Sequence, residues 1–168
     1  MTTIQQIQSL LKVTPDGTWG PKSQAALDAA TKPATACDDW HAVKASSFAD
    51  PEDVAGYLSA KAAGMSDVEA FAHGDNGVGC WGDDCASGDP MCALPPDDMV
   101  ARFGSVAAAK HAGVLVRSAD KEILCTLADR MPWKKNITNG CGIDLNPAAC
   151  SLLGLRPPMT IQAAWKWA

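Results

Sequence analysis

Apolar positions recur at helical spacing near the start of the chain and at strand spacing near its end. A narrow apolar stripe predicts a first helix, formed by Ile4, Ile7, Leu10 and Leu11. A turn at 15–17 and Pro21 at a first helical position then predict a second short helix. Two short helices bury little surface alone, so residues 1–32 are expected to form a small helical module that leans on another part or on a partner.

From residue 41 the pattern changes to strands interrupted by helices. Strands are expected at 41–48, 114–117, 123–128 and 160–167, the last with strict alternation of apolar and polar residues. Helices are expected from Pro51 to about Ala63, after Ser66 and over 147–153, with Asp50, Ser66 and Asn146 as N-caps. Residues 73–96 are dense in Gly, Asp and Pro and predict a long loop. The pattern indicates a mainly β domain at 41–168, joined by a linker at 33–40.

Composition narrows the function classes. The chain of 168 residues has a formal net charge of −5, which argues against a nucleic-acid partner. Its apolar runs are too short for a membrane span. No basic region followed by an apolar stretch opens the chain, so no secretory signal peptide is predicted. Neither the oligomeric state nor a cofactor is indicated.

Residues 7–27 contain the motif Asp16-Gly17-Thr18-Trp19-Gly20 between two helical stretches. The segment resembles the peptidoglycan-binding module of cell-wall hydrolases, although the third helix of that module is missing. The resemblance implies peptidoglycan as a partner and gives Trp19 an aromatic face for sugar. The alternative is a helical hairpin that only supports the second domain.

Two further stretches carry a second resemblance, Leu127-Ala128-Asp129-Arg130-Met131-Pro132 and Gly142-Ile143-Asp144-Leu145-Asn146-Pro147. They are similar to segments of the double-psi β-barrel shared by RlpA-type lytic transglycosylases, expansins and family 45 endoglucanases. The resemblance implies a six-stranded double-psi β-barrel with helical insertions. It also matches residues 45–50 to the first barrel strand, which places Asp50 where the endoglucanases carry their water-activating base.

The resemblance implies a protein that cleaves glycan strands with carboxylates. Glycosidic cleavage needs an acid to protonate the leaving oxygen, and hydrolysis needs a second carboxylate to activate water. Asp144 is the expected acid, Asp129 positions or polarises it, and Asp50 is a candidate base. A lytic transglycosylase needs only the acid and its partner, because the muramic acid's own hydroxyl attacks in place of water. Candidate substrate-binding residues are Trp133, Trp81, Ser46, His73 and Trp19.

Several alternatives stay open at this stage. Asp50 is also a suitable helix cap, Asp144 a suitable turn residue, and Asp129 a suitable ion-pair partner for Arg130. Expansins keep the two later aspartates without hydrolysing their polymer, so binding without cleavage is one alternative and a β-1,4-glucanase is another. The transglycosylases carry a His shortly before a Leu-Pro, which this chain lacks, and His73 is the candidate substitute. A wall target without a signal peptide favours release by lysis, carriage on a phage particle or a non-classical export route.

The seven cysteines suggest disulfides if the protein works outside the cell. An odd count leaves one thiol over, and Cys37 in the linker is the first candidate. The six cysteines expected to pair are Cys80, Cys85, Cys92, Cys125, Cys141 and Cys150. Their spacing matches no zinc site. Two minority hypotheses are a cysteine nucleophile with one of the three histidines and a cation held in the 75–84 loop.

Overall fold

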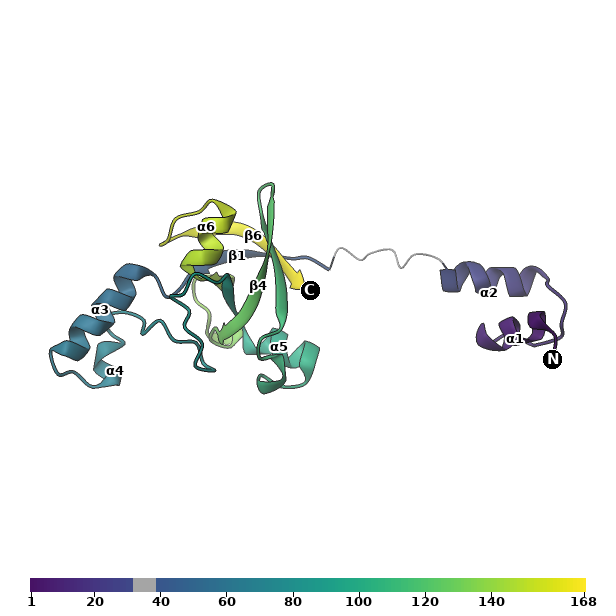
Figure 1. Cartoon of the computed structure of the whole chain (residues 1–168), viewed down its shortest axis with the longest axis horizontal. Coiled ribbons are helices and arrows are strands. Elements are labelled where there is room, and N and C mark those ends of the chain that lie inside the picture. The colour runs from purple at the N-terminus through teal and green to yellow at the C-terminus, as the bar shows by residue number, and fades with distance from the viewer. Residues whose placement is uncertain (32–38) are drawn as a thin grey trace. The chain divides into compact units, whose positions relative to one another are not determined.

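The computed structural model describes residues 1–31 and 39–168 and divides into two compact units, Met1–Asp39 and Trp40–Ala168 (Figure 1). Most of the predicted linker, including Cys37, lies outside the described residues. Within the described ranges, no helix is long and apolar enough to cross a membrane.

The N-terminal unit contains the two predicted helices, α1 (Thr3–Leu10) and α2 (Pro21–Thr31). A capping box begins α1, because the Thr2 hydroxyl accepts the backbone N–H of Gln5 while the Gln5 side chain accepts that of Thr2. The predicted apolar stripe is not what this unit buries. Gln8 is 1% exposed, whereas Leu10 is 82% exposed.

Gln8 is buried because it ties the turn between the helices to both of them. Its Nε2 lies 2.8 Å from an Asp16 carboxylate oxygen, 2.9 Å from the Thr18 carbonyl and 2.9 Å from the Ser23 hydroxyl. Its Oε1 accepts the backbone N–H of Gly17. A 31-residue segment with little apolar surface therefore folds around a satisfied polar side chain rather than around its Ile and Leu residues.

The second unit is a closed barrel of six strands, in the order β1-β5-β2-β4-β3-β6. Two neighbouring pairs are parallel, β1 with β5 and β2 with β4, and the others are antiparallel. This arrangement confirms the predicted fold class of a mainly β, six-stranded double-psi barrel. The strands are β1 (His41–Ser47), β2 (Met91–Leu94), β3 (Gly113–Ser118), β4 (Lys121–Arg130), β5 (Cys141–Leu145) and β6 (Thr160–Trp167).

Helices occupy the connections of the barrel. The predicted helices are confirmed as α3 (Pro51–Ala62), α4 (Asp67–Ala70) and α6 (Pro147–Leu153). Here α3 and α4 pack on each other through Tyr57, Ala60 and Ala70, to one side of the strands (Figure 1). Elements that the sequence analysis did not predict are β2, β5, α5 (Pro96–Phe103) and the short turns η1 (Ala107–Ala109) and η2 (Lys134–Asn136).

Asn146 fastens the long 71–90 loop to the barrel. It caps α6 as predicted, since its Oδ1 accepts the backbone N–H of Ala149 at 3.0 Å, and the same oxygen accepts that of Met91 at 2.9 Å. Its Nδ2 donates to the carbonyls of Cys85 and Asp89 at 3.0 and 2.8 Å. A fully buried amide with all four bonds made is a strong organiser of local structure.

The expectation of disulfides is wrong for the six cysteines that the structure describes, because all six are free thiols. Five of them are buried and pack as small apolar side chains, and the Cys92 and Cys125 thiols share a hydrogen bond in the core. Cys92, Cys125 and Cys150 belong to the barrel core, Cys85 packs with Ala49 and Ala128, Cys141 lies in a second small cluster, and Cys80 is exposed.

Candidate functional site

Two of the predicted aspartates lie in one row across the outside of the barrel. The Cα partner of Ala93 in β2 is Asp144 in β5 on one side and Asp129 in β4 on the other. Asp144 is in turn opposite Ser46 of β1. The neighbours of Asp144 in β5, Ile143 and Leu145, fill the core, so alternation turns Asp144 outward. Bringing the two carboxylates onto one face is a product of strand order.

Irregular pairing between neighbouring strands brings Ser46, Asp144 and Asp129 into this row. The pairing of β2 with β4 skips Ala128, and the pairing of β1 with β5 skips Gly142. Each skipped residue is the extra residue of a bulge, which reverses the facing of the residues that follow it. Without these bulges, Asp129 and Asp144 would not share the outer face with Ala93 and Ser46.

Asp144 is an acid whose proton is held in part up to about pH 6. Its pKa is raised from 3.8 to about 6, mainly by burial and to a smaller extent by the charges of Asp129 and Asp50. A hydrogen bond donated by the Ser46 hydroxyl to Oδ1 acts in the opposite direction. About half of such carboxyls would be protonated at pH 6, so Asp144 is suited to give and take a proton.

Asp129 is bound by backbone groups and by the Cys80 side chain, and no cation pairs with it among the residues that the structure describes. One carboxylate oxygen accepts the N–H of Cys80 at 2.8 Å and that of Arg130 at 2.7 Å. The ion pair with Arg130 that the sequence left open is therefore replaced by a bond to the Arg130 backbone. Burial raises the pKa of Asp129, while the two backbone bonds lower it. This geometry fixes the carboxylate beside the loop residue Cys80.

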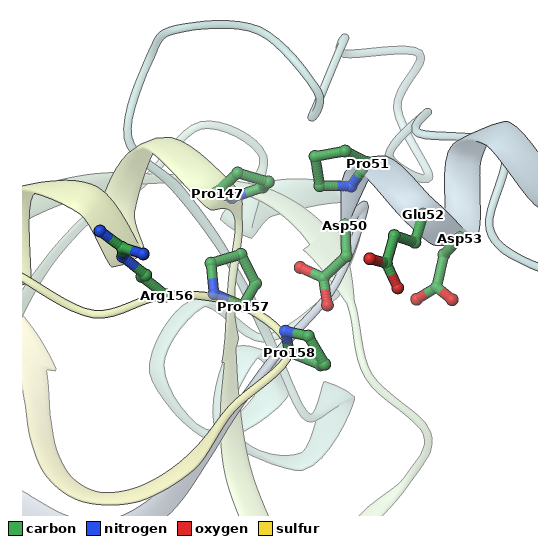
Figure 2. Close-up of a pocket in the computed structure, with 8 residues that line it drawn as sticks. All are labelled: Asp50, Pro51, Glu52, Asp53, Pro147, Arg156, Pro157 and Pro158. Carbon is green, nitrogen blue, oxygen red and sulfur yellow. The ribbon is translucent and has the colours of Figure 1, made fainter.

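Asp50 stands at the N-cap position of α3 but does not act as a cap. Its side chain makes no bond to the first turn of the helix. One oxygen accepts the Ser47 hydroxyl at 2.7 Å, and the other is buried with no hydrogen-bond partner among the described residues. Asp50 is 4% exposed, and burial raises its pKa. It lines a cavity of about 390 Å³ with residues of α3, α6 and the 156–158 segment (Figure 2).

The aromatic candidates lie in two neighbouring hollows. Trp133 is 44% exposed and lines a cavity of about 350 Å³ together with Arg130. Trp81 is half-buried and lines one of about 290 Å³, whose walls include Arg130 and Cys80. Arg130 thus borders both hollows, and Cys80 connects the second one to Asp129 through its N–H.

Two candidates stand apart from these hollows. Trp19 belongs to the N-terminal unit, where its indole N–H donates to Gln24 at 3.0 Å. The side chain of His73 is exposed at the end of α4, and its backbone carbonyl packs against Gly56 of α3. No bond joins His73 to the three aspartates within the described part of the chain, so its role as a substitute histidine stays a prediction.

The cysteine-nucleophile hypothesis gains no support. Burial is the largest cause that raises the pKa of Cys80 to about 11 and those of Cys85 and Cys150 to about 12, so these thiols stay protonated. Two of the three histidines are engaged elsewhere: His111 lies 2.8 Å from Asp83, and His41 stacks on Trp165.

The loop carboxylates are used for turns. Asp75, Asn76 and Asp84 each accept a backbone N–H two residues further along the chain. Among the described residues, no group of three or more His, Cys, Asp or Glu is placed to hold a metal ion.

Sequence reasoning missed the roles of Ser47, the Cys80 N–H and Arg130. The Ser47 to Asp50 spacing of three residues is a signal that could have been found, because a hydroxyl and a carboxylate at that spacing often bond locally. The roles of Cys80 and Arg130 depend on a contact between segments 49 residues apart.

Comparisons with known proteins add little to this geometry. No protein-family model matches the chain, and no curated protein matches it. Among solved structures, the chain is similar to the Streptomyces papain inhibitor, with 16% identity, a TM-score of 0.45 and coverage of 77% of this chain and 94% of that one.

Proposed function

We propose that the protein binds peptidoglycan and cleaves its glycan strands, with Asp144 as the general acid. The observation that carries this proposal is the placement of Asp144 on the outer face of β5, with a pKa raised to about 6 and with Asp129 two strands away in the same row, across β2. A carboxyl that is partly protonated near neutral pH is what protonation of a glycosidic oxygen requires.

The transglycosylase scheme fits the carboxylates better than hydrolysis does. Asp144 gives its proton to the leaving oxygen as the bond from that oxygen to C1 of the muramic acid breaks. The muramic acid's own 6-hydroxyl then bonds to C1 and returns a proton to the Asp144 carboxylate. Hydrolysis would need a base that activates water, and the candidate base Asp50 is buried and lines a cavity other than the two hollows of Trp133 and Trp81. In this proposal, Asp50 is therefore outside the reaction.

Binding would use the aromatic hollows and the N-terminal unit. Trp133 and Trp81 flank Arg130, and a sugar ring can stack on either indole while the guanidinium binds a carboxylate of the wall polymer. Trp19 offers a third aromatic surface on the separate helical unit. The protein would act on the cell wall, and release by lysis or on a phage particle fits this role.

The test is the identity of the fragments released from purified peptidoglycan. Anhydro-muramyl ends in the mass spectrum are expected from the wild-type protein, and none from Asp144→Asn. Asp120→Asn, in the exposed β3–β4 turn, makes the same charge change and should release fragments like the wild type. Reducing muramyl ends would replace the transglycosylase by a hydrolase, and release from a soluble β-1,4-glucan instead would make the protein an endoglucanase.

Binding without cleavage is the second candidate function. It is favoured by the burial of Asp50, because expansin-like proteins keep two carboxylates in their barrel and do not hydrolyse their polymer. Pelleting of the protein with insoluble peptidoglycan without any released fragment would establish this candidate and overturn the enzymatic one.

A further inference from the structure

The cavity beside Asp50 is not used by the proposed reaction, and its walls have an unusual chemistry. Of its eight lining residues, four are prolines and three are carboxylates, Asp50, Glu52 and Asp53. The eighth is Arg156, whose guanidinium points away from the Asp50 carboxylate in Figure 2. Neither Asp144 nor Asp129 lines this cavity.

Asp50 supplies an acceptor that lacks a donor. The residue is only 4% exposed, and its Oδ1 has no hydrogen-bond partner among the described residues. A buried carboxylate oxygen without a donor costs free energy, and native structures rarely leave one in that state. Ser47 cannot serve this oxygen, since its hydroxyl already donates to Oδ2.

Apart from Arg156, whose guanidinium points away from Asp50 in Figure 2, the side chains that line the cavity offer no donor to this oxygen. Proline rings have no N–H group and present saturated C–H faces. Glu52 and Asp53 are acceptors when ionised, so the cavity carries three potential negative charges against one positive charge. A ligand for this site must bring hydrogen-bond donors, a positive charge and a small saturated body.

We infer that this cavity binds a primary ammonium group carried on a saturated carbon chain or ring, with Asp50 as its buried counter-ion. The ammonium donates to Asp50 Oδ1, Glu52 and Asp53 lie close enough to attract its charge, and the proline rings contact its carbon atoms. Two sources share this chemistry, a lysine-like side chain and an amino sugar with a free amine. A divalent metal is disfavoured, because no suitable group of ligands occurs in the described ranges.

Binding of small probes by the full chain tests the inference without any glycan. The charged probes are Nα-acetyl-lysine methylamide and glucosamine, and the matched neutral probes are Nα-acetyl-norleucine methylamide and N-acetylglucosamine. At least one charged probe is expected to shift the NMR signals of residues 50–53 and 156–158, and its neutral match is not. The probe that binds more tightly identifies the source. Equal binding of charged and neutral probes, or no binding by either charged probe, overturns the inference.

Variants locate the site. Asp50→Asn should weaken the bound amine about tenfold or more, and Glu52→Gln only a few-fold, because one is the direct partner and the other an exposed charge. Asp120→Asn carries the same charge change at a distant turn and should leave the affinity unaltered. Equal affinity of Asp50→Asn and the wild type would rule out this residue as the counter-ion.

A readout specific to the ion pair guards against a merely structural effect. Titration of the Asp50 carboxyl by carbon NMR should show its pKa falling when the charged probe is added and staying constant with the neutral one. A pKa that does not move would overturn the proposed contact. Loss of glycan cleavage, or its absence, has no bearing on these measurements, so the two proposals fail separately.

Discussion

Ser46 and Ser47 are consecutive residues of β1, yet each donates a hydrogen bond to a different aspartate, Ser46 to Asp144 and Ser47 to Asp50. Burial raises the pKa of both carboxyls. Asp144 lies in a row across the outer face of the barrel, whereas Asp50 lines a cavity between α3 and the prolines of the 156–158 segment. Two similar serine–aspartate pairs are thus placed in different surroundings, one on the outer face of the barrel and one in the wall of a cavity.

The difference shows that a raised pKa alone does not assign a function. Asp144 shares its face with a second carboxylate, and in the proposed reaction it gives its proton to the bound polymer. Asp50 has a free oxygen, apolar walls and other acidic residues beside it, which is the environment of a counter-ion. The location of each carboxylate and the residues around it therefore distinguish the proposed acid, Asp144, from the proposed binding group, Asp50.

The largest expected effect separates the two aspartates by activity. Asp144→Asn should lower fragment release from peptidoglycan by about 100-fold or more, because general acid catalysis typically contributes that much. Asp50→Asn should change it by less than about threefold, since the proposed reaction does not use that carboxylate. The measurement is the initial rate of fragment release at one pH for folded variants. Equal losses would make Asp50 the base of a hydrolase, and both aspartates would then belong to one catalytic site.

A second large effect is expected on stability, at Asn146, which lies between the row of Asp144 and the cavity of Asp50. Asn146 lies two residues after Asp144 and directly before Pro147 of the cavity, and its fully buried side chain makes four hydrogen bonds. Asn146→Ala should lower the free energy of unfolding by about 4 kcal/mol, because it leaves buried backbone groups unpaired. Urea unfolding measures this change. The control is Asn139→Ala, an exposed residue with one local bond, which should cost less than about 1 kcal/mol.

Preferences of neighbouring residues in the sequence predict much of the fold, whereas the site depends on how distant strands pair. Pro51 and Asn146 mark the starts of α3 and α6 correctly, because helix starts depend on neighbouring residues. The four residues of β2 were missed, since a strand between β4 and β5 is held by its partners rather than by its own pattern. The burial of Gln8 likewise reflects its bonds to Asp16, Thr18 and Ser23.

The same limit applies to the carboxylates. The resemblance selected Asp129 and Asp144, but their common row depends on strand order and on bulges at Ala128 and Gly142. No periodicity in one strand encodes how it is aligned with the next. The idea that Asp50 caps its helix was a sound local expectation, and the bond from Ser47 replaces the cap.

A third prediction concerns the pH dependence of stability. Because the pKa of Asp144 is about 6 when folded and near 3.8 when unfolded, the folded protein binds this proton more tightly. The resulting stabilisation is full below about pH 4 and is lost as the pH rises through about 6. Asp144→Asn should therefore be about 3 kcal/mol more stable than the wild type at pH 8, with this advantage absent at pH 4. Urea unfolding at both pH values measures the difference. An advantage that is the same at pH 4 and pH 8 would contradict the raised pKa.

The smallest effect distinguishes the two serines. Ser46→Ala should raise the pH at which Asp144 titrates by about one unit, because the hydroxyl stabilises the ionised carboxylate, and should leave the titration of Asp50 in place. Ser47→Ala should do the reverse, raising the pKa of Asp50 alone. For each variant, carbon NMR of the aspartate carboxyls measures the titrations of Asp144 and Asp50 in one sample. If either substitution moved both titrations equally, the two regions would be one coupled site, and the amine-binding role of Asp50 would have to be tested as part of the glycan-cleaving one.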